Sequence, residues 1–234
     1  MSAQQQTAKN TNKKVFVDLI ICILIPTLIL KKLSGPENLG PTYAFALAIS
    51  LPLAVAVYEM VTERKVGLVS ALGFISILLT GGIGLLKLPK EYIAYKEALI
   101  PSVFALAAII STYTTKPLVR LFLYNEMIMQ TELVAAKLEQ NQRESEFAQV
   151  MNKATMMLAA SFLLSALLNF ILAKVIIVSE TGTAAFNDEL GTMNLLSYPV
   201  IVLPCMVVTI YTLFYVVRNI SRLTGLEMEQ IVRQ

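Results

Sequence analysis

The chain has 234 residues, of which 56% are hydrophobic and only 15% are charged, and its formal net charge is +3. Soluble domains are about one-quarter charged residues, so this composition argues against a soluble globular protein. The sequence contains no histidine, the commonest general base and the commonest transition-metal ligand. We therefore expect no metal site, no cofactor and no enzymatic activity.

The apolar residues gather in six long blocks, at residues 15–30, 43–61, 66–86, 92–113, 154–178 and 198–217. An α-helix of about 20 residues crosses the ~30 Å hydrocarbon core of a bilayer, and several blocks approach or meet that length. In lipid, helices satisfy every backbone polar group within one segment. The sequence therefore predicts an all-α fold, a polytopic membrane helical bundle of about six transmembrane helices built as three hairpins.

Polar segments divide this bundle into parts. We expect a polar cytoplasmic N-terminus at residues 1–14, a four-helix transmembrane half at 15–115, a two-helix transmembrane hairpin at 153–218 and a cytoplasmic amphipathic tail at 219–234. Cys22 and Cys205 lie inside apolar blocks and are expected to pack as small apolar residues.

The first two blocks carry one carboxylate each. Lys13 and Lys14 precede the first block like the basic flank of a signal peptide, but no small-residue cleavage pattern follows, which favours an uncleaved helix. Asp18 lies three residues into this block, and Glu59 lies near the inner end of the second. Because an ionisable group within a span is costly, both are candidate site residues, although a position near the headgroups is the favoured explanation.

The third block contains a repeat of small residues. Ser76, Thr80 and Gly84 are four residues apart, and small residues at this spacing let helices approach closely. Packing is the favoured interpretation. The alternative is that Gly81 and Gly82 break the helix end and expose backbone dipoles, which transporters use to bind ions.

Two charged residues, Lys96 and Glu97, stand together near the start of the fourth block. Neighbours on a helix point roughly 100° apart, so we expect them not to pair with each other. The apolar stretch after them, residues 98–113, is slightly short of a full crossing, which places them near the outer boundary. They are either interfacial anchors or members of a buried polar network.

Residues 116–152 are of mixed character. Leu118, Leu121 and Phe122 lie at helical spacing beside Lys116 and Arg120, which predicts a helix on the cytoplasmic membrane surface. The later part, residues 137–148, is expected to project into water. A soluble helical segment without lipid contact explains the pattern equally well.

The last hairpin has a polar stripe and an acidic connection. Ser161, Ser165 and Asn169 are four apart, so they should face other helices, either as interhelical hydrogen bonds or as the lining of a pathway. Residues 179–194 are polar and acidic and are expected to form an outer loop.

Basic residues concentrate on one side of this topology. With the N-terminus inside, the inner segments carry Lys9, Lys13, Lys14, Arg64, Lys65, Lys116, Arg120, Lys137, Arg143, Lys153, Arg218, Arg222 and Arg233, whereas the outer loops carry only Lys31, Lys32, Lys87 and Lys90. The excess of basic residues marks the cytoplasmic side. We therefore expect a multi-pass protein of the inner (plasma) membrane with both termini in the cytoplasm.

Three motifs resemble a known group of proteins. The stretches TGGIGLL, YKEALIP and KPLVR, within residues 66–125, are similar to a group of uncharacterised bacterial membrane proteins related to the intracellular septation protein A family. The matching residues are Thr80, Gly81, Gly82, Lys96, Pro101, Lys116 and Pro117. The septation family tends to have proline after the lysine, where this chain has Glu97. The resemblance implies an inner-membrane protein connected with envelope upkeep or division.

Two functions remain open at this point. The first is transport or lipid handling, supported by the recurring FALAI at 45–49 and FALAA at 104–108 and by a set of polar positions. That set is Asp18, Glu59, Thr80, Gly81, Gly82, Lys96, Glu97, Ser165 and Asn169. The second is a non-catalytic membrane scaffold that recruits division or envelope partners through residues 116–152 and the tail. The expected partners are the lipid bilayer, further copies of the chain or envelope and division proteins, and no nucleic acid.

Overall fold

The computed structural model describes residues 20–63, 68–114, 117–126 and 128–232. These residues are almost all helical, and they contain no β-strand beyond one isolated antiparallel bridge between Met129 and Val232. The predicted all-α fold is therefore confirmed. The chain divides into two compact units, one of residues 1–100 and 169–198 and the other of residues 101–168 and 199–234.

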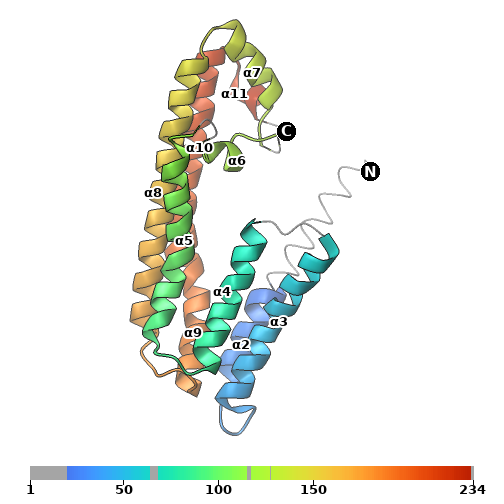
Figure 1. Cartoon of the computed structure of the whole chain (residues 1–234), viewed down its shortest axis with the longest axis vertical. Helices are drawn as coiled ribbons and strands as arrows, with labels where there is room; N and C mark the ends of the chain where they lie inside the picture. The colour runs from blue at the N-terminus through green and yellow to red at the C-terminus, as the bar shows by residue number, and fades with distance from the viewer. Residues whose placement is uncertain (1–19, 64–67, 115–116, 127, 233–234) are drawn as a thin grey trace. The chain divides into compact units, whose positions relative to one another are not determined.

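The first unit is built mainly from the N-terminal helices. It contains the π-helical turn η1 (Ile20–Leu24), α2 (Ile25–Leu33), α3 (Gly40–Glu63), α4 (Leu68–Leu85), α9 (Ala184–Ser197), the first part of α5 (Glu91–Ser111) and the last part of α8 (Glu144–Ile176) (Figure 1). The second unit contains the rest of α5 and α8 with α6 (Val119–Phe122), α7 (Thr131–Gln140), α10 (Leu203–Thr224) and α11 (Met228–Ile231). A second π-helical turn, η2 (Tyr198–Val202), joins α9 to α10.

Four helical stretches among the described residues are long and apolar enough to cross a membrane. They are Gly40–Tyr58, Glu91–Ser111, Glu144–Ile176 and Ala184–Thr224, and a shorter apolar helix covers Phe74–Leu85. Large apolar side chains along them, such as Leu106 and Val207, remain more than half exposed, as expected of helices that face lipid. These helices indicate a membrane protein.

Prolines explain both π-helical turns. Pro26 follows η1 and Pro204 follows η2, each within the first two residues of the next α-helix. Proline has no N–H to donate to the carbonyl four residues earlier, and a local π-helical register accommodates the missing bond. Pro52 and Pro101, in contrast, lie inside α3 and α5, which remain continuous.

Helix α4 packs closely on α3. A Cβ atom added at Gly84 would lie 2.1 Å from Cζ of Phe45, so the Phe45 ring rests directly on the glycine backbone. This contact confirms the close helix approach predicted from the small-residue repeat. The predicted break at Gly81 and Gly82 is wrong, because α4 continues to Leu85 and the Leu86 amide still donates to the Gly82 carbonyl, at 3.0 Å.

Residues 179–194 are not the predicted outer loop, because most of them form α9. Thr183 caps the helix by accepting a hydrogen bond from the Phe186 amide, at 3.1 Å. Where α9 packs against α2, Asn187 is completely buried and Asp188 pairs with Lys31. The polar composition of this segment therefore reflects helix packing as well as solvent contact.

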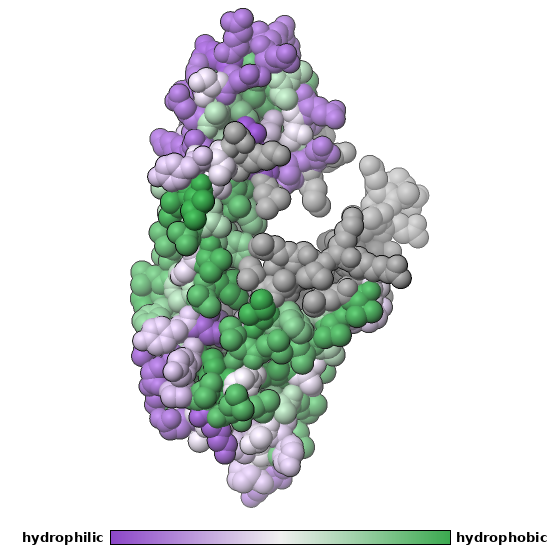
Figure 2. All heavy atoms as spheres, in the orientation of Figure 1, coloured by the Kyte–Doolittle hydropathy of each residue, from purple (hydrophilic) through white to green (hydrophobic). Residues whose placement is uncertain are grey.

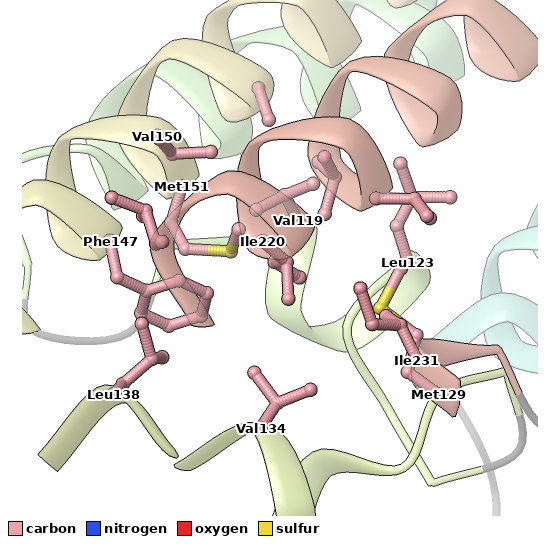
Figure 3. Close-up of a cluster of buried hydrophobic side chains, with 14 residues drawn as sticks. Val119, Leu123, Met129, Val134, Leu138, Phe147, Val150, Met151, Ile220 and Ile231 are labelled. Carbon is pink, nitrogen blue, oxygen red and sulfur yellow. The ribbon is translucent and has the colours of Figure 1, made fainter. Parts of the chain in front are cut away.

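The second unit has a compact hydrophobic core at one end (Figure 3). It is formed by Val119, Leu123, Met129, Val134, Leu138, Phe147, Val150, Met151, Ala154, Val216, Val217, Ile220, Leu223 and Ile231. These residues come from α6, α7, the start of α8, the end of α10 and α11. The short helices α6, α7 and α11 thus pack against the long helices α8 and α10.

The first part of the segment 116–152, predicted as a helix on the membrane surface, contributes to this core. The segment is broken into α6, α7 and the first turns of α8, so the boundary expected between residues 152 and 153 falls inside one continuous helix. Within α6, Val119 is completely buried in the protein core. Residues 115–116, which include Lys116, lie outside the described residues, and so does the side chain of Leu121.

The predicted amphipathic tail is short and well packed. Gly225 ends α10 in the left-handed conformation, with φ of 74°, and α11 follows. The Gln130 amide donates to the Ile231 carbonyl, at 2.8 Å, so the tail is bound to the segment before α7. Burial raises the pKa of Tyr124 above its ordinary value, and the positive charge of nearby Arg120 offsets only part of that rise. The Tyr124 hydroxyl donates to the Thr131 carbonyl at 3.2 Å.

In the second unit, hydrophilic side chains cover the end around α7 and hydrophobic ones cover the long helices (Figure 2). Along α8 the sequence changes from polar to apolar residues at Lys153, whose ammonium lies 5.5 Å from the ring centroid of Tyr215 in α10. On α10 the exposed residues pass from Phe214 to Arg218 within one turn. Aromatic and basic residues at this point are typical of the boundary between lipid and water.

Candidate functional site

A cavity of about 430 Å³ lies within the first unit, between its helices. Most of its lining is apolar and comes from five helical segments. Its walls are formed by Cys22, Pro26 and Leu30, by Ala48, Ile49, Pro52, Val55 and Ala56 of α3, by Phe74, Ser76, Ile77 and Thr80 of α4, by Lys96 and Glu97 of α5, and by Leu190 and Asn194 of α9. This volume is in the range of small-molecule sites in proteins.

One wall of the cavity carries a polar chain that links α4 to α5. The Lys96 ammonium donates to Thr80 Oγ1 at 2.8 Å and pairs with Glu97 Oε1 at 2.6 Å. Thr80 in turn donates to the Ser76 carbonyl at 3.0 Å. The Lys96 side chain is 7% exposed and that of Glu97 is 23% exposed, so the pair is shielded mainly by protein. An ion pair in such an environment is stronger than the same pair in water.

The prediction that Lys96 and Glu97 do not pair is wrong. The helical geometry separates the directions of their Cα–Cβ bonds, but the long lysine stem bends back over the intervening distance. The structure places both residues at a protein cavity.

The turn between α4 and α5 brings this chain together. The Leu88 amide donates to the Ile83 carbonyl at 2.9 Å, and Lys87 adopts a left-handed conformation with φ of 52°. The start of α5 therefore lies beside the end of α4. As a result, Thr80 and Lys96 face each other although they are 16 positions apart.

Pro52 changes the backbone hydrogen bonding of α3, which forms one wall of the cavity. Because proline has no N–H, the Ala48 carbonyl lacks its usual helical donor. Ala48 and Pro52 both line the cavity. The helix that forms this wall thus keeps an acceptor available for other donors.

The other predicted site residues divide into three groups. Gly81 and Gly82 lie beside Thr80 but do not line the cavity, and a Cβ at Gly81 would contact Ile49. Ser165 and Asn169 of α8 do not line it either. Asp18 lies outside the described residues, as does the side chain of Glu59, whose backbone belongs to α3.

Sequence reasoning missed the contribution of α9. Asn194 lines the cavity, and Asn187 donates to Ser34 Oγ and to the Pro41 carbonyl, both at 2.8 Å. A signal was present, since Asn187, Gly191 and Asn194 are spaced as one face of a helix and Thr183 precedes them as a suitable N-cap.

Asn187 gives a prediction about the assembly of this unit. Asn187→Ala removes a buried hydrogen bond to Ser34 and a part-buried one to the Pro41 carbonyl, so we expect a loss of about 1–3 kcal/mol in stability. Thermal unfolding in detergent would measure it. The control is Asn38→Ala, which removes an exposed bond to the Lys32 carbonyl, at 3.2 Å, and should change little. Equal melting temperatures for the two variants would contradict the assigned role.

The three connections expected on the outer side meet at one end of this unit. Thr181 donates to the Leu88 carbonyl at 2.7 Å, and Lys31 pairs with Asp188 at 3.0 Å and donates to Thr192 at 2.7 Å. Lys90 pairs with Glu180 at 3.3 Å and also donates to the Val178 carbonyl. The lysines of the predicted outer loops are thus partly neutralised by the acidic segment 179–194.

The described residues contain no group of three or more His, Cys, Asp or Glu side chains placed to hold a metal ion. The apolar helices indicate a membrane protein, and its first unit contains a cavity. The chain matches no protein-family model, no curated protein and no solved structure. The similarity to the septation protein A group therefore stays a prediction.

Proposed function

We propose that the protein binds a small amphipathic molecule in the cavity of the first unit and acts in transport or lipid handling for upkeep of the cell envelope. The observation that carries the proposal is an apolar cavity of about 430 Å³ with a single polar chain of Thr80, Lys96 and Glu97 on its wall. Apolar walls with a few placed polar groups are the usual form of a small-molecule site.

We place this function in the inner membrane, with six transmembrane helices in three hairpins and both termini in the cytoplasm. The proposal is supported by the meeting of the three predicted outer connections and by the basic residues near the boundary at Lys153. Tags at each terminus should be inaccessible from outside in intact cells. An externally accessible C-terminal tag would overturn the topology.

A cavity-filling substitution tests the binding site. Val55 lines the cavity, so Val55→Phe should displace the bound amphiphile, whereas Val57→Phe, at a 45% exposed position outside the lining, should not. Native mass spectrometry of the purified protein would detect the molecules that remain bound. Equal retention by wild type and Val55→Phe would count against a ligand in this cavity.

The ion pair gives a second test. Lys96→Ala leaves the Glu97 carboxylate without its partner, so it should destabilise the protein more than the double variant Lys96→Ala, Glu97→Ala, which removes both charges. The double variant should accumulate normally but lose the transport or lipid phenotype. Normal function in the double variant would remove both residues from the site.

The alternative function is a non-catalytic scaffold that recruits division or envelope partners. It is favoured by the compact hydrophilic end of the second unit, formed by α6, α7 and α11 around its own core. Crosslinkers placed on exposed residues of α7, such as Glu139, would test it. Capture of a specific division or envelope protein would support the scaffold. If no protein is crosslinked to these positions, the result would argue against it.

A further inference from the structure

We propose that the cavity selects a zwitterionic ligand, a molecule that carries an ammonium and an anionic group close together on an apolar body. This inference rests on the proposed function and names the chemistry of its ligand. The two sources of such chemistry are a zwitterionic lipid and a free apolar amino acid.

The charge balance of the cavity is the first argument. Among its described lining residues, only Lys96 and Glu97 carry a charged side chain, and they neutralise each other. A ligand with a net charge would leave one unbalanced charge in an apolar environment, which is costly. A neutral or zwitterionic molecule avoids that cost.

The unused hydrogen-bonding capacity of the pair is the second argument. An ammonium has three N–H donors, and Lys96 uses two of them on Thr80 and Glu97. Glu97 binds Lys96 through Oε1, and Oε2 has no hydrogen-bond partner among the described residues. The site therefore offers one donor to an anionic group and one carboxylate oxygen to an ammonium, next to each other.

The surroundings of the pair fit the same ligand. Asn194, which also lines the cavity, has an amide that both donates and accepts hydrogen bonds. The Ala48 carbonyl, deprived of its helical donor by Pro52, is a further acceptor for an ammonium. The remaining walls, with side chains such as Ile49 and Ile77, suit an apolar body.

The test compares single-chain lipids of equal length that differ only in the head. The full-length protein in detergent would be titrated with lipids that carry a phosphoethanolamine, phosphoglycerol, trimethylammonium or uncharged glycerol head. Native mass spectrometry would measure the amount of each lipid bound. We expect the zwitterionic head to bind about tenfold more tightly than the uncharged one, the lower range for charge-assisted hydrogen bonds. If free leucine competes with the lipid, the site is assigned to an amino acid. If free leucine does not compete, the site is assigned to a lipid.

Single substitutions should invert the charge preference. Lys96→Gln leaves a net negative site that should favour the cationic head, and Glu97→Gln leaves a net positive site that should favour the anionic head. If either variant fails to fold, the double variant Lys96→Gln, Glu97→Gln should bind zwitterionic and uncharged heads equally. The control, Lys90→Gln with Glu180→Gln, removes an ion pair outside the cavity and should keep the wild-type preference.

The outcomes separate this inference from the proposed function. Zwitterion selection would be overturned if the wild type bound all heads tightly without a preference, or if every variant kept the same preference. Either result would still leave the cavity as a binding site. Retention of no amphiphile by the wild type would overturn both.

Discussion

Gly84→Ala is expected to destabilise the first unit and to reduce ligand retention. The new Cβ would lie 2.1 Å from Cζ and 2.3 Å from Cε1 of Phe45. Phe45 is 3% exposed and also packs on Phe186, with ring centroids 6.1 Å apart, so its ring has little room to move. Overpacking of this kind costs about 1–3 kcal/mol, and this contact belongs at the upper end.

The effect should extend to the cavity, because α3 and α4 form two of its walls. If α3 moves away from α4 to relieve the contact, Ala48 and Thr80 separate and the site loses its shape. Thermal unfolding and mass spectrometry of the bound amphiphile would measure the two effects on one sample.

Gly82→Ala is the matched control for this experiment. A Cβ at Gly82 has no atom within 4 Å, and alanine favours a helix by up to about 1 kcal/mol over glycine. This variant should therefore be as stable as the wild type or slightly more stable. A Gly82 variant that melts as early as the Gly84 variant would show that helix flexibility, and not the contact with Phe45, determines the result.

Ile231→Ala is expected to open the core of the second unit. Ile231 is completely buried beside Met129 and Val134, although it lies only three residues from the end of the chain (Figure 3). Truncation of a buried isoleucine to alanine costs about 2–5 kcal/mol through lost burial and the cavity that remains. The bond from the Gln130 amide to the Ile231 carbonyl should weaken with it.

Hydrogen exchange would show this effect as faster exchange in α7 and α11, with the cavity-lining helices of the first unit unchanged. Met228→Ala, at a 41% exposed position of the same short helix, is the control and should leave exchange as in the wild type. Unchanged exchange in Ile231→Ala would mean that the tail does not close this core.

The close approach at Gly84 could be predicted because it depends on local spacing alone. Ser76, Thr80 and Gly84 recur at the helical period, and any helix that carries them has a narrow face. The candidate site was also partly visible, since Thr80, Lys96 and Glu97 were all singled out by their polarity in apolar blocks. The contact between these residues could not be predicted, because it depends on the turn at residues 86–90 and on the bend of the lysine stem.

Helix α9 shows why polarity alone misled the prediction. Asn187 and Asp188 are typical of loops, yet their partners Ser34, Pro41 and Lys31 lie about 150 residues earlier in the chain. A polar group is tolerated in a packed interface when its hydrogen bonds are made there. Composition gives the polarity of a segment but not the location of its partners.

The sequence by itself determined that the chain is helical and apolar enough for membranes, because length and hydropathy of a segment are local properties. It also singled out Thr80, Lys96 and Glu97 as polar residues within apolar blocks. Only the tertiary structure decided which of them meet. It joined Lys96 to Thr80 and Glu97, placed Asn194 at the same cavity and brought Ile231 back onto α7 and α10, since such contacts depend on how distant segments pack.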